Sequence, residues 1–338
     1  MSAKLSSVDI PVVDISEDKH AAKALVDAAS RHGFVFVQDS EAYITKKQKN
    51  HMFNLSRSFF SSPVSVKETC SINSNKSGKN KGWLSMGTET LDPGHQKRGD
   101  LKEAFNLGEF ADGKAQQPLP KTMIPHEEDI HQFTVSCHRL CNRILRLFAS
   151  GLEISNQDWF SERHDQTKGP SGTAYWMMTE QYPSVPDNGQ DLSEDIRAGA
   201  HSDYGSITLL FQLRGQPGLE ILTPENKWSS VPVNPRNEEN LPILVNIGDL
   251  LSYWTHGLLK STVHRVIFPK DGKIGGEDRY SIAYFCHPQD DAALLPVPSP
   301  LIEQHRSSKD SVVAENIMTA KDHLDNRLAA TYGLKKAS

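Results

Sequence analysis

The stretch that decides how this chain is interpreted is Ala200–Leu210, which has the sequence AHSDYGSITLL. Its second half is β-branched and apolar, which is typical of a buried strand. Because side chains alternate along a strand, His201 and Asp203 are expected to point to the same face and to be able to bind one ion together. A single His-x-Asp pair also occurs by chance as a surface histidine beside a solvated aspartate. The pair therefore indicates a metal site only if a third ligand exists.

His264 is the candidate third ligand. It lies in KSTVHRVI, residues 260–267, a β-branched run that predicts another strand. Two rival histidines are placed less favourably, because His256 lies in a Thr-His-Gly turn and His287 directly precedes a proline. Turn positions aim a ligand less reliably than strands do.

Two histidines and one carboxylate form a recognisable donor set. His201, Asp203 and His264 would occupy one face of an octahedral ion and leave three positions open, which is the arrangement of non-haem Fe(II) oxygenases. Zinc would more often be four-coordinate. The donor set therefore favours Fe(II), with residues His201, Asp203 and His264 as both metal ligands and catalytic residues.

A carboxylate-binding pair follows 15 residues after His264. In RYSIAYF, residues 279–285, Arg279 and Ser281 alternate onto one strand face. A guanidinium group and a hydroxyl suit a carboxylate, because bidentate charge-assisted hydrogen bonds fix its orientation. By itself the pair could equally form a structural salt bridge. Beside the triad, it is a candidate for holding the far carboxylate of a dicarboxylate whose other end chelates iron.

The chain around these motifs predicts a mainly β fold with flanking helices. After Gly172, short β-branched and aromatic runs alternate with turn clusters, which favours an antiparallel double-stranded β-helix, a jelly roll of the cupin-like kind. Apolar residues at three- and four-residue steps predict a helix over 130–148. Another helix is expected over about 19–31, ending at Gly33 before a buried strand, Phe34–Val37.

We expect one catalytic unit made of four parts. These are an N-terminal α/β region that packs on the core (1–120), a helical connector (121–170), the jelly-roll core (171–290) and a C-terminal helical segment (291–338). Loops over residues 76–82 and 87–92 are candidates for a lid. Phe211 and Phe285 either line the cavity or pack the core.

Composition and charge narrow the class of partner. A net charge of −5 and a pI near 6.3 provide no basic field for nucleic acid. No run of 18 apolar residues and no apolar leader are present, which predicts a cytoplasmic protein without a membrane anchor. The four cysteines form no Cys-x-x-Cys pair, and Cys137 and Cys141 are expected in the core. The oligomeric state is left open.

In these motifs the chain resembles the 2-oxoglutarate/Fe(II)-dependent oxygenases of the isopenicillin N synthase-like group. The match comprises His-x-Asp, a histidine after 60 intervening residues and Arg-x-Ser, in that order. It extends through IPVVDI (10–15), GFVFV (33–37), FFSSP (59–63) and DLKEAFNLG (100–108), and so spans nearly the whole chain. Residues 201–212 and 279–286 look especially like fungal members such as thymine 7-hydroxylase.

The resemblance implies an enzyme that uses Fe(II), 2-oxoglutarate and O2 to oxidise, most often hydroxylate, a small organic molecule with release of succinate and CO2. It also implies that Tyr182 contacts 2-oxoglutarate, although an ordinary strand-end aromatic is nearly as good an interpretation. Segment 245–250, with Asn246, matches another family segment that we interpret as a structural turn before a strand; the lesser alternative is that Asn246 faces the pocket.

Several alternatives stay open. The leading substrate is a fungal secondary-metabolite intermediate, and a pyrimidine base, as for thymine 7-hydroxylase, is the alternative. An oxidase that needs no 2-oxoglutarate, like isopenicillin N synthase, a metal-holding module without turnover and a zinc-dependent hydrolase are further possibilities. Succinate release that depends on 2-oxoglutarate would exclude the first, and substrate-dependent O2 uptake would exclude the second. The third predicts activity without air and without iron.

Overall fold

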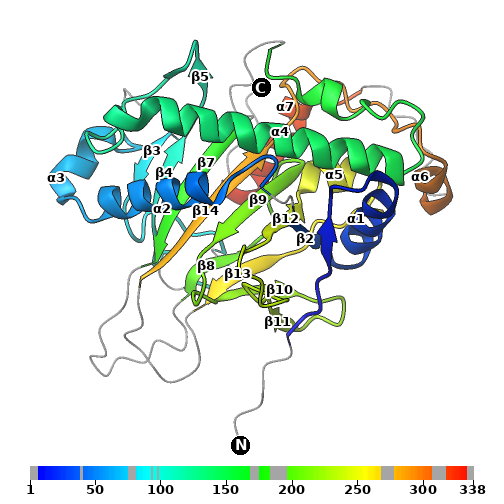
Figure 1. Cartoon of the computed structure of the whole chain (residues 1–338), viewed down its shortest axis with the longest axis horizontal. Helices are drawn as coiled ribbons and strands as arrows, with labels where there is room; N and C mark the ends of the chain where they lie inside the picture. Colours follow the sequence, from blue (N-terminus) through cyan, green and yellow to red (C-terminus); the bar gives the residue numbers. More distant parts are fainter. Residues whose placement is uncertain are drawn as a thin grey trace, which may run out of the picture.

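Two β-sheets face each other, and a layer of helices covers the outer face of the larger one (Figure 1). The computed structural model describes residues 7–38, 41–74, 81–92, 94–96, 99–167, 175–182, 196–267, 278–306 and 317–332, with the backbone alone at 19, 175–182, 196 and 331–332. The predicted jelly-roll class, mainly β with flanking helices, is confirmed.

The larger sheet has eight strands, and all neighbours are antiparallel except the first pair. In spatial order they are β1 (Val12–Asp14), β2 (Phe34–Gln38), β12 (Ile243–Ile247), β9 (Ile207–Gln212), β14 (Arg279–Cys286), β7 (Tyr175–Tyr182), β4 (Glu103–Leu107) and β3 (Gly82–Leu84). Strands from the N-terminal region thus extend both edges of the sheet, outside β9, β12 and β14.

The smaller sheet is antiparallel and has four strands. They are β11 (Trp228–Ser230), β10 (Leu219–Leu222), β13 (His264–Ile267) and β8 (Ile196–His201), and a separate hairpin joins β5 (Phe110–Ala111) to β6 (Lys114–Ala115). The two strands that carry the candidate histidines, β8 and β13, are neighbours at one edge of this sheet.

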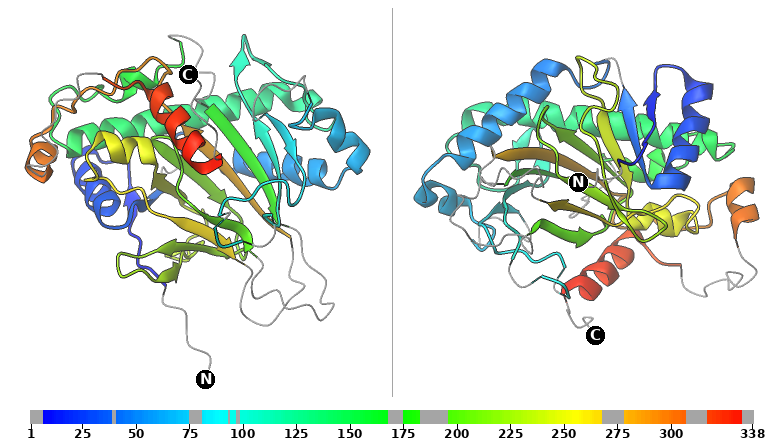
Figure 2. Two further views of the ribbon diagram at one scale, coloured as in Figure 1. Left: turned by 180° about the vertical axis from the view of Figure 1, so that it is seen from behind. Right: turned by 90° about the horizontal axis from the view of Figure 1, so that it is seen from below.

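Three long helices pack on the larger sheet. They are α1 (Asp18–His32), α2 (Lys46–Phe60) and α4 (Glu127–Gly151), and α4 runs across the face of the sheet (Figures 1 and 2). The shorter helices are α3 (Val64–Lys67), η1 (Glu68–Cys70), η2 (Ile124–His126), η3 (Ser161–His164), α5 (Asp249–Trp254), α6 (Pro300–His305) and α7 (Ala320–Tyr332). The helix predicted over 130–148 is confirmed, and the helix predicted over 19–31 ends at Gly33 as expected.

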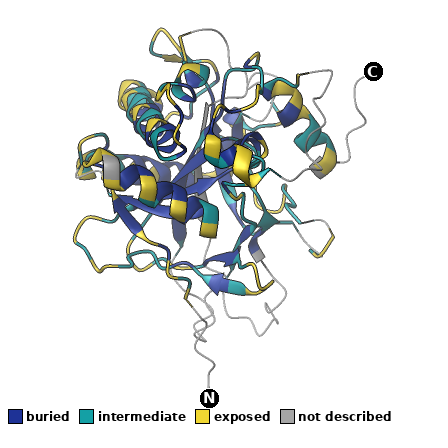
Figure 3. Cartoon of the chain, turned by 90° about the vertical axis from the view of Figure 1, so that its right-hand side faces the viewer, coloured by how far each residue is buried: buried dark blue, intermediate teal, exposed yellow. Residues whose placement is uncertain are grey.

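Side-chain alternation divides the apolar residues between two cores. On β2, Val35 and Val37 join the core under the helices, whereas Phe34 and Phe36 join the core between the two sheets. The strand is therefore buried on both faces, as its continuous apolar sequence predicts. Figure 3 shows buried strands beneath helices that expose only their outer faces.

Strand β14 divides its side chains in the same way. Tyr280, Ile282 and Tyr284 point into the core under the helices. The alternate residues, Arg279, Ser281, Ala283 and Phe285, line a cavity between the sheets. The core under the helices thus fixes which face of β14 is presented to the site.

The buried cysteines Cys137 and Cys141 pack in the core under the helices, as expected. In the part of the chain that the structure describes, no helix combines the length and apolarity needed to cross a membrane. The four-part division of the chain stays a prediction, as does the lid, part of which (76–80) lies outside the described residues.

Candidate metal centre

Strand pairing brings together the two histidines, which are far apart in sequence. His201 is the last residue of β8 and His264 the first of β13, and the register pairs them directly. Their ring centroids are 4.3 Å apart. The two imidazoles therefore lie side by side at the end of the smaller sheet, where the chain turns toward Asp203.

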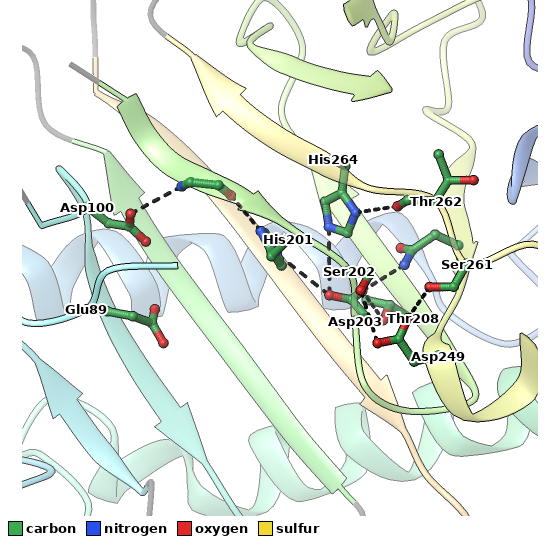
Figure 4. Close-up of polar contacts among 12 residues, drawn as sticks. Glu89, Asp100, His201, Ser202, Asp203, Thr208, Asp249, Ser261, Thr262 and His264 are labelled. Carbon is green, nitrogen blue, oxygen red and sulfur yellow. Dashed lines mark hydrogen bonds and ion pairs between the residues drawn. The ribbon is translucent and has the colours of Figure 1, made fainter. Parts of the chain in front are cut away.

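Asp203 completes a cluster of three donors. Its Oδ1 lies 3.8 Å from His201 Nε2 and 3.7 Å from His264 Nε2, and all three donor atoms lie within 4.8 Å of one another (Figure 4). The rivals His256 and His287 belong to no such cluster among the described residues. The structure thus brings together the three residues that the sequence predicts as ligands.

Hydrogen bonds set the orientation of both imidazoles. His201 Nδ1 lies 2.7 Å from Gly199 O, and His264 Nδ1 lies 3.1 Å from Thr262 O. Because a carbonyl oxygen can only accept, each Nδ1 carries the proton and each Nε2 presents its lone pair to the centre of the cluster. Backbone carbonyls commonly fix the tautomer of metal-binding histidines in this way.

The carboxylate of Asp203 is held by two buried side chains. Thr208 Oγ1 and Asn246 Nδ2 donate to its Oδ2 at 2.6 Å and 2.7 Å. This leaves Oδ1 directed at the imidazoles. Burial would raise the pKa of Asp203, but the imidazoles of His264 and His201 and these two hydrogen bonds outweigh burial and hold the pKa below its usual value. The carboxylate is therefore available as an anionic ligand.

The sequence did not predict that Thr208 and Asn246 hold the carboxylate of Asp203. Segment 245–250 is not a turn before a strand, because Asn246 lies within β12 and the strand is followed by Gly248 and helix α5. A polar residue inside the apolar run ILVNI is the signal that could have identified it, since a buried amide needs a partner.

We predict that Thr208→Val weakens metal binding about 10–100-fold, the usual effect of removing a hydrogen bond to a metal ligand. Valine keeps the shape of threonine, but Asp203 Oδ2 loses a donor and the carboxylate can rotate. The measurement is the dissociation constant of Fe(II) or Co(II) for the purified protein.

Thr255→Val is the matched control. Thr255 is also buried, but it follows the last residue of α5, and its hydroxyl donates to Leu251 O of that helix at 2.8 Å, not to a member of the cluster. Equal metal affinity for the Thr208 variant and wild type would show that the hydroxyl does not position Asp203.

Asp249 joins the segments that carry the donors. Its carboxylate accepts from Ser202 (3.0 Å) and Ser261 (2.6 Å), which lie next to His201 and three residues before His264 (Figure 4). Arg327 of α7 pairs with the same carboxylate at 2.7 Å. This contact, which no sequence pattern indicated, links α7 to the segments that carry His201 and His264.

The N-terminal region also reaches the cluster. Asp100 is buried and accepts a hydrogen bond from Gly199 N at 3.2 Å, and Gly199 O in turn receives His201 Nδ1. A Cβ at Gly199 would lie 2.2 Å from Gln96 Oε1. The added Cβ would also lie 2.8 Å from the backbone nitrogen of Asp92, which cannot move aside as the end of a side chain can, so glycine lets the backbone at Asp92 lie this close to β8.

Arg279 and Ser281 share a cavity with the cluster. Both side chains are buried, and Arg279 Nη1 lies 3.3 Å from Ser281 Oγ. The cavity is lined by the three donor residues, by Thr208, Asn246, Arg279 and Ser281, and by Phe34, Ala198, Leu210, Leu219, Val266, Ala283 and Phe285. Of the two phenylalanines singled out in the sequence, Phe285 lines this cavity and Phe211 packs under the helices.

Tyr182 is described by its backbone alone. It is the last residue of β7, and the register pairs it with Arg279. Its backbone is therefore adjacent to that of Arg279, and a contact with 2-oxoglutarate stays a prediction.

The donor set fits a divalent iron ion. Two imidazoles and one carboxylate suit Fe(II), and all three of these residues line the cavity. The arginine and serine in the same cavity fit a carboxylate.

Two family models match the chain. The 2OG-Fe(II) oxygenase superfamily matches residues 173–288, and the family described as non-haem dioxygenase in morphine synthesis N-terminal matches residues 10–127. The first match includes the whole cluster together with Arg279 and Ser281.

Curated relatives match over nearly the whole chain. The UPF0676 protein C1494.01 of Schizosaccharomyces pombe is 36% identical over 97% of this chain and 94% of its own length. The 2-oxoglutarate-dependent dioxygenase htyE of Aspergillus rugulosus is 27% identical over 91% of this chain and 92% of its own length.

Solved structures agree with these matches. A full-length Neurospora crassa protein in complex with alpha-KG and thymine superposes with a TM-score of 0.76 at 27% identity, covering 96% of this chain and 97% of its own. The same protein with alpha-KG and 5-formyluracil gives a TM-score of 0.76 at 26% identity, covering 97% of this chain and 100% of its own.

Proposed function

Because the chain belongs to the 2-oxoglutarate/Fe(II)-dependent oxygenase superfamily and is therefore an iron- and 2-oxoglutarate-dependent dioxygenase, we propose that His201, Asp203 and His264 hold its iron and that Arg279 and Ser281 hold its 2-oxoglutarate. The observation that carries the proposal is that both groups of residues line one cavity. The overall reaction inserts one oxygen atom of O2 into a C–H bond of a small organic molecule, and 2-oxoglutarate takes the other and leaves as succinate and CO2.

The bound iron and 2-oxoglutarate supply the oxidising chemistry, and the protein supplies position and environment. His201, Asp203 and His264 bind the ion from one side. Arg279 orients the far carboxylate of 2-oxoglutarate through its planar guanidinium group, and the hydroxyl of Ser281 donates to the same carboxylate. Thr208 and Asn246 keep Asp203 directed at the ion.

The apolar lining has its own role. Phe34, Leu219 and Val266 belong to the core between the sheets and also line the cavity. They exclude water from the end of the cavity that holds the cosubstrate, which strengthens the charge-assisted hydrogen bonds of Arg279.

For the substrate, we propose an intermediate of fungal secondary metabolism. The likeness of residues 201–212 and 279–286 to fungal oxygenases supports this, as does the match to htyE of Aspergillus rugulosus. Except for the donor residues and Thr208, Asn246, Arg279 and Ser281, the described lining is apolar, which suits a molecule oxidised at a carbon-rich position.

A pyrimidine base is the second candidate. The likeness to the Neurospora crassa protein, which was solved with thymine and with 5-formyluracil, favours it. Such a base carries polar groups along its ring edge that need hydrogen-bond partners when buried.

One experiment tests the function and separates these candidates. The purified enzyme with Fe(II), ascorbate, 2-oxoglutarate and air is offered a panel of secondary-metabolite intermediates, thymine and uracil, and succinate and substrate mass are measured together. We expect one class to gain about 16 mass units in step with succinate, as insertion of one oxygen atom requires. Product formation without 2-oxoglutarate would contradict the cosubstrate assignment and support an oxidase like isopenicillin N synthase.

We predict that Arg279→Lys weakens 2-oxoglutarate binding more than it slows the reaction. Lysine keeps the charge but cannot form two parallel hydrogen bonds to a carboxylate. Loss of one charge-assisted hydrogen bond, about 1.5–3 kcal/mol, corresponds to an increase in KM for 2-oxoglutarate of roughly 10–100-fold.

Arg265→Lys is the matched control. Arg265 on β13 makes two hydrogen bonds, at 2.9 and 2.7 Å, to Glu220 Oε2 on β10, and both strands belong to the smaller sheet. It should leave KM for 2-oxoglutarate unchanged. An equal KM for wild type and Arg279→Lys would argue against a direct contact.

A further inference from the structure

A second cluster of metal-binding side chains lies on the helical side of the molecule. It consists of His51, His126 and Asp129, whose donor atoms all lie within 4.8 Å of one another. His51 is on α2, His126 ends η2 and Asp129 lies in the first turn of α4. We propose that this cluster binds a zinc ion, or a similar late transition-metal ion, that links α2 to the start of α4.

The distances within the cluster suit one ion. Asp129 Oδ2 lies 3.1 Å from His51 Nε2 and 3.5 Å from His126 Nδ1. Donors bound to a tetrahedral zinc ion at about 2.0–2.1 Å lie about 3.3 Å apart, so both distances are close to that value. An ordinary histidine–aspartate hydrogen bond would account for His51 alone, whereas here both rings approach the same carboxylate oxygen.

The two rings pack against each other and so hold their donor atoms together. Their centroids are 4.9 Å apart with an interplanar angle of 72°. Side-chain exposures of 34% for His51 and 38% for His126 leave a path for an ion and room for a water as fourth ligand. This partly open geometry differs from that of the candidate iron centre, which lies in the cavity between the sheets.

The supporting helices are fixed at this point. Thr45 and Gln48 form a capping box at the start of α2, and Gln48 Nε2 also lies 3.4 Å from Ser136 Oγ of α4. Little rearrangement is therefore needed on binding, which favours affinity.

The local charge attracts a cation. The first turn of α4 contains Glu127, Glu128 and Asp129, and Lys114 pairs with Glu127 at 2.8 Å, which leaves the turn acidic. Two imidazoles with one carboxylate favour zinc, copper or nickel over calcium and magnesium, which take oxygen ligands.

Zinc stoichiometry tests the proposal. The iron-free full-length chain is dialysed against micromolar Zn²⁺, and bound zinc is measured by atomic absorption. Wild type is expected to bind two equivalents of zinc, one at each cluster. His51→Ala and Asp203→Ala should each bind one equivalent, and the variant that carries both substitutions should bind none. Zinc should also raise the melting temperature of Asp203→Ala more than that of the double variant, because an ion bound to the folded state stabilises it.

His20→Ala is the matched control and should keep two equivalents. His20 also lies near a carboxylate, with Nδ1 4.0 Å from Glu17 Oε2, but it has no third donor among the described residues. If His51→Ala is poorly folded, Asp129→Asn replaces it, since Asp129 is exposed and the change preserves shape. Two equivalents bound by His51→Ala or Asp129→Asn, or no zinc bound by Asp203→Ala, would overturn the proposal without affecting the assignment of the iron centre.

Discussion

Asp203→Ala is expected to abolish turnover. The metal ion contributes several kcal/mol to the reaction, and each 1.36 kcal/mol corresponds to a factor of ten in rate, so we expect a loss of about 10³-fold or more. The reason is specific to the geometry, because Asp203 Oδ1 is the atom toward which both imidazoles point. The measurements are bound iron per chain and the rate of succinate formation from 2-oxoglutarate.

Two controls separate loss of the ligand from loss of the fold. Asp27→Ala removes an exposed carboxylate that pairs with Lys23 on α1, and it should leave both measurements unchanged. Asp203→Asn keeps the hydrogen bond from Thr208 but loses the anionic ligand, so it should fail like alanine. Wild-type turnover in either Asp203 variant would refute the assignment.

Gly33→Ala is expected to cause the largest loss of stability among these substitutions. Gly33 ends α1 with φ of 70°, and an added Cβ would lie 2.3 Å from Thr262 Oγ1 and 2.4 Å from Lys260 O. The left-handed conformation costs a non-glycine residue about 1–2 kcal/mol. Overpacking against a backbone carbonyl adds about 1–3 kcal/mol. We therefore expect the free energy of unfolding to fall by roughly 2–5 kcal/mol.

Gly215→Ala isolates the backbone contribution. Gly215 has φ of 78°, but nothing lies within 4 Å of an added Cβ. Gly215→Ala should lower the free energy of unfolding only through the cost of the left-handed backbone conformation, about 1–2 kcal/mol. Denaturant unfolding of both variants measures the difference, and equal destabilisation would show that contact with the segment before His264 is unimportant.

Gly33 also connects the fold to the site. The segment it touches, residues 260–262, leads directly into β13, and Thr262 O orients His264. A shift of this segment would move His264 relative to Asp203. We therefore expect Gly33→Ala to weaken iron binding as well as the fold.

Local patterns were enough to predict several parts of the site. Alternation along β14 placed Arg279 and Ser281 on one face, and the cavity has both on its wall. The helical period of the apolar residues in α4 and the glycine that ends α1 could also be recognised from the local sequence. In each case the determining interactions lie within a few residues, where sequence patterns are informative.

Other parts depend on contacts between distant segments. The pairing of His201 with His264 follows from the register of β8 with β13, which no single strand encodes. Asn246 and Thr208 reach Asp203 from two strands of the larger sheet, so their roles appear only after the sheets face each other. Donor chemistry and the family resemblance predicted His264 as a ligand, but they did not predict that Asn246 lies within a strand and donates to Asp203.

Asp249 and Asp100 are the clearest cases of this limit. Asp249 accepts hydrogen bonds from residues 47 positions before it and 12 after it, and Asp100 bonds a backbone amide 99 residues away. An aspartate in sequence gives no sign of such partners, because most aspartates are solvated.

The most direct test of the account is a crystal structure of the protein loaded with Mn²⁺ in place of Fe(II) and with 2-oxoglutarate, with anomalous differences recorded to locate the ion. We expect an anomalous peak at coordination distance, about 2.0–2.3 Å, from His201 Nε2, Asp203 Oδ1 and His264 Nε2, with the far carboxylate of 2-oxoglutarate on Arg279 and Ser281. The absence of a peak at these three atoms, with manganese bound elsewhere, would contradict it.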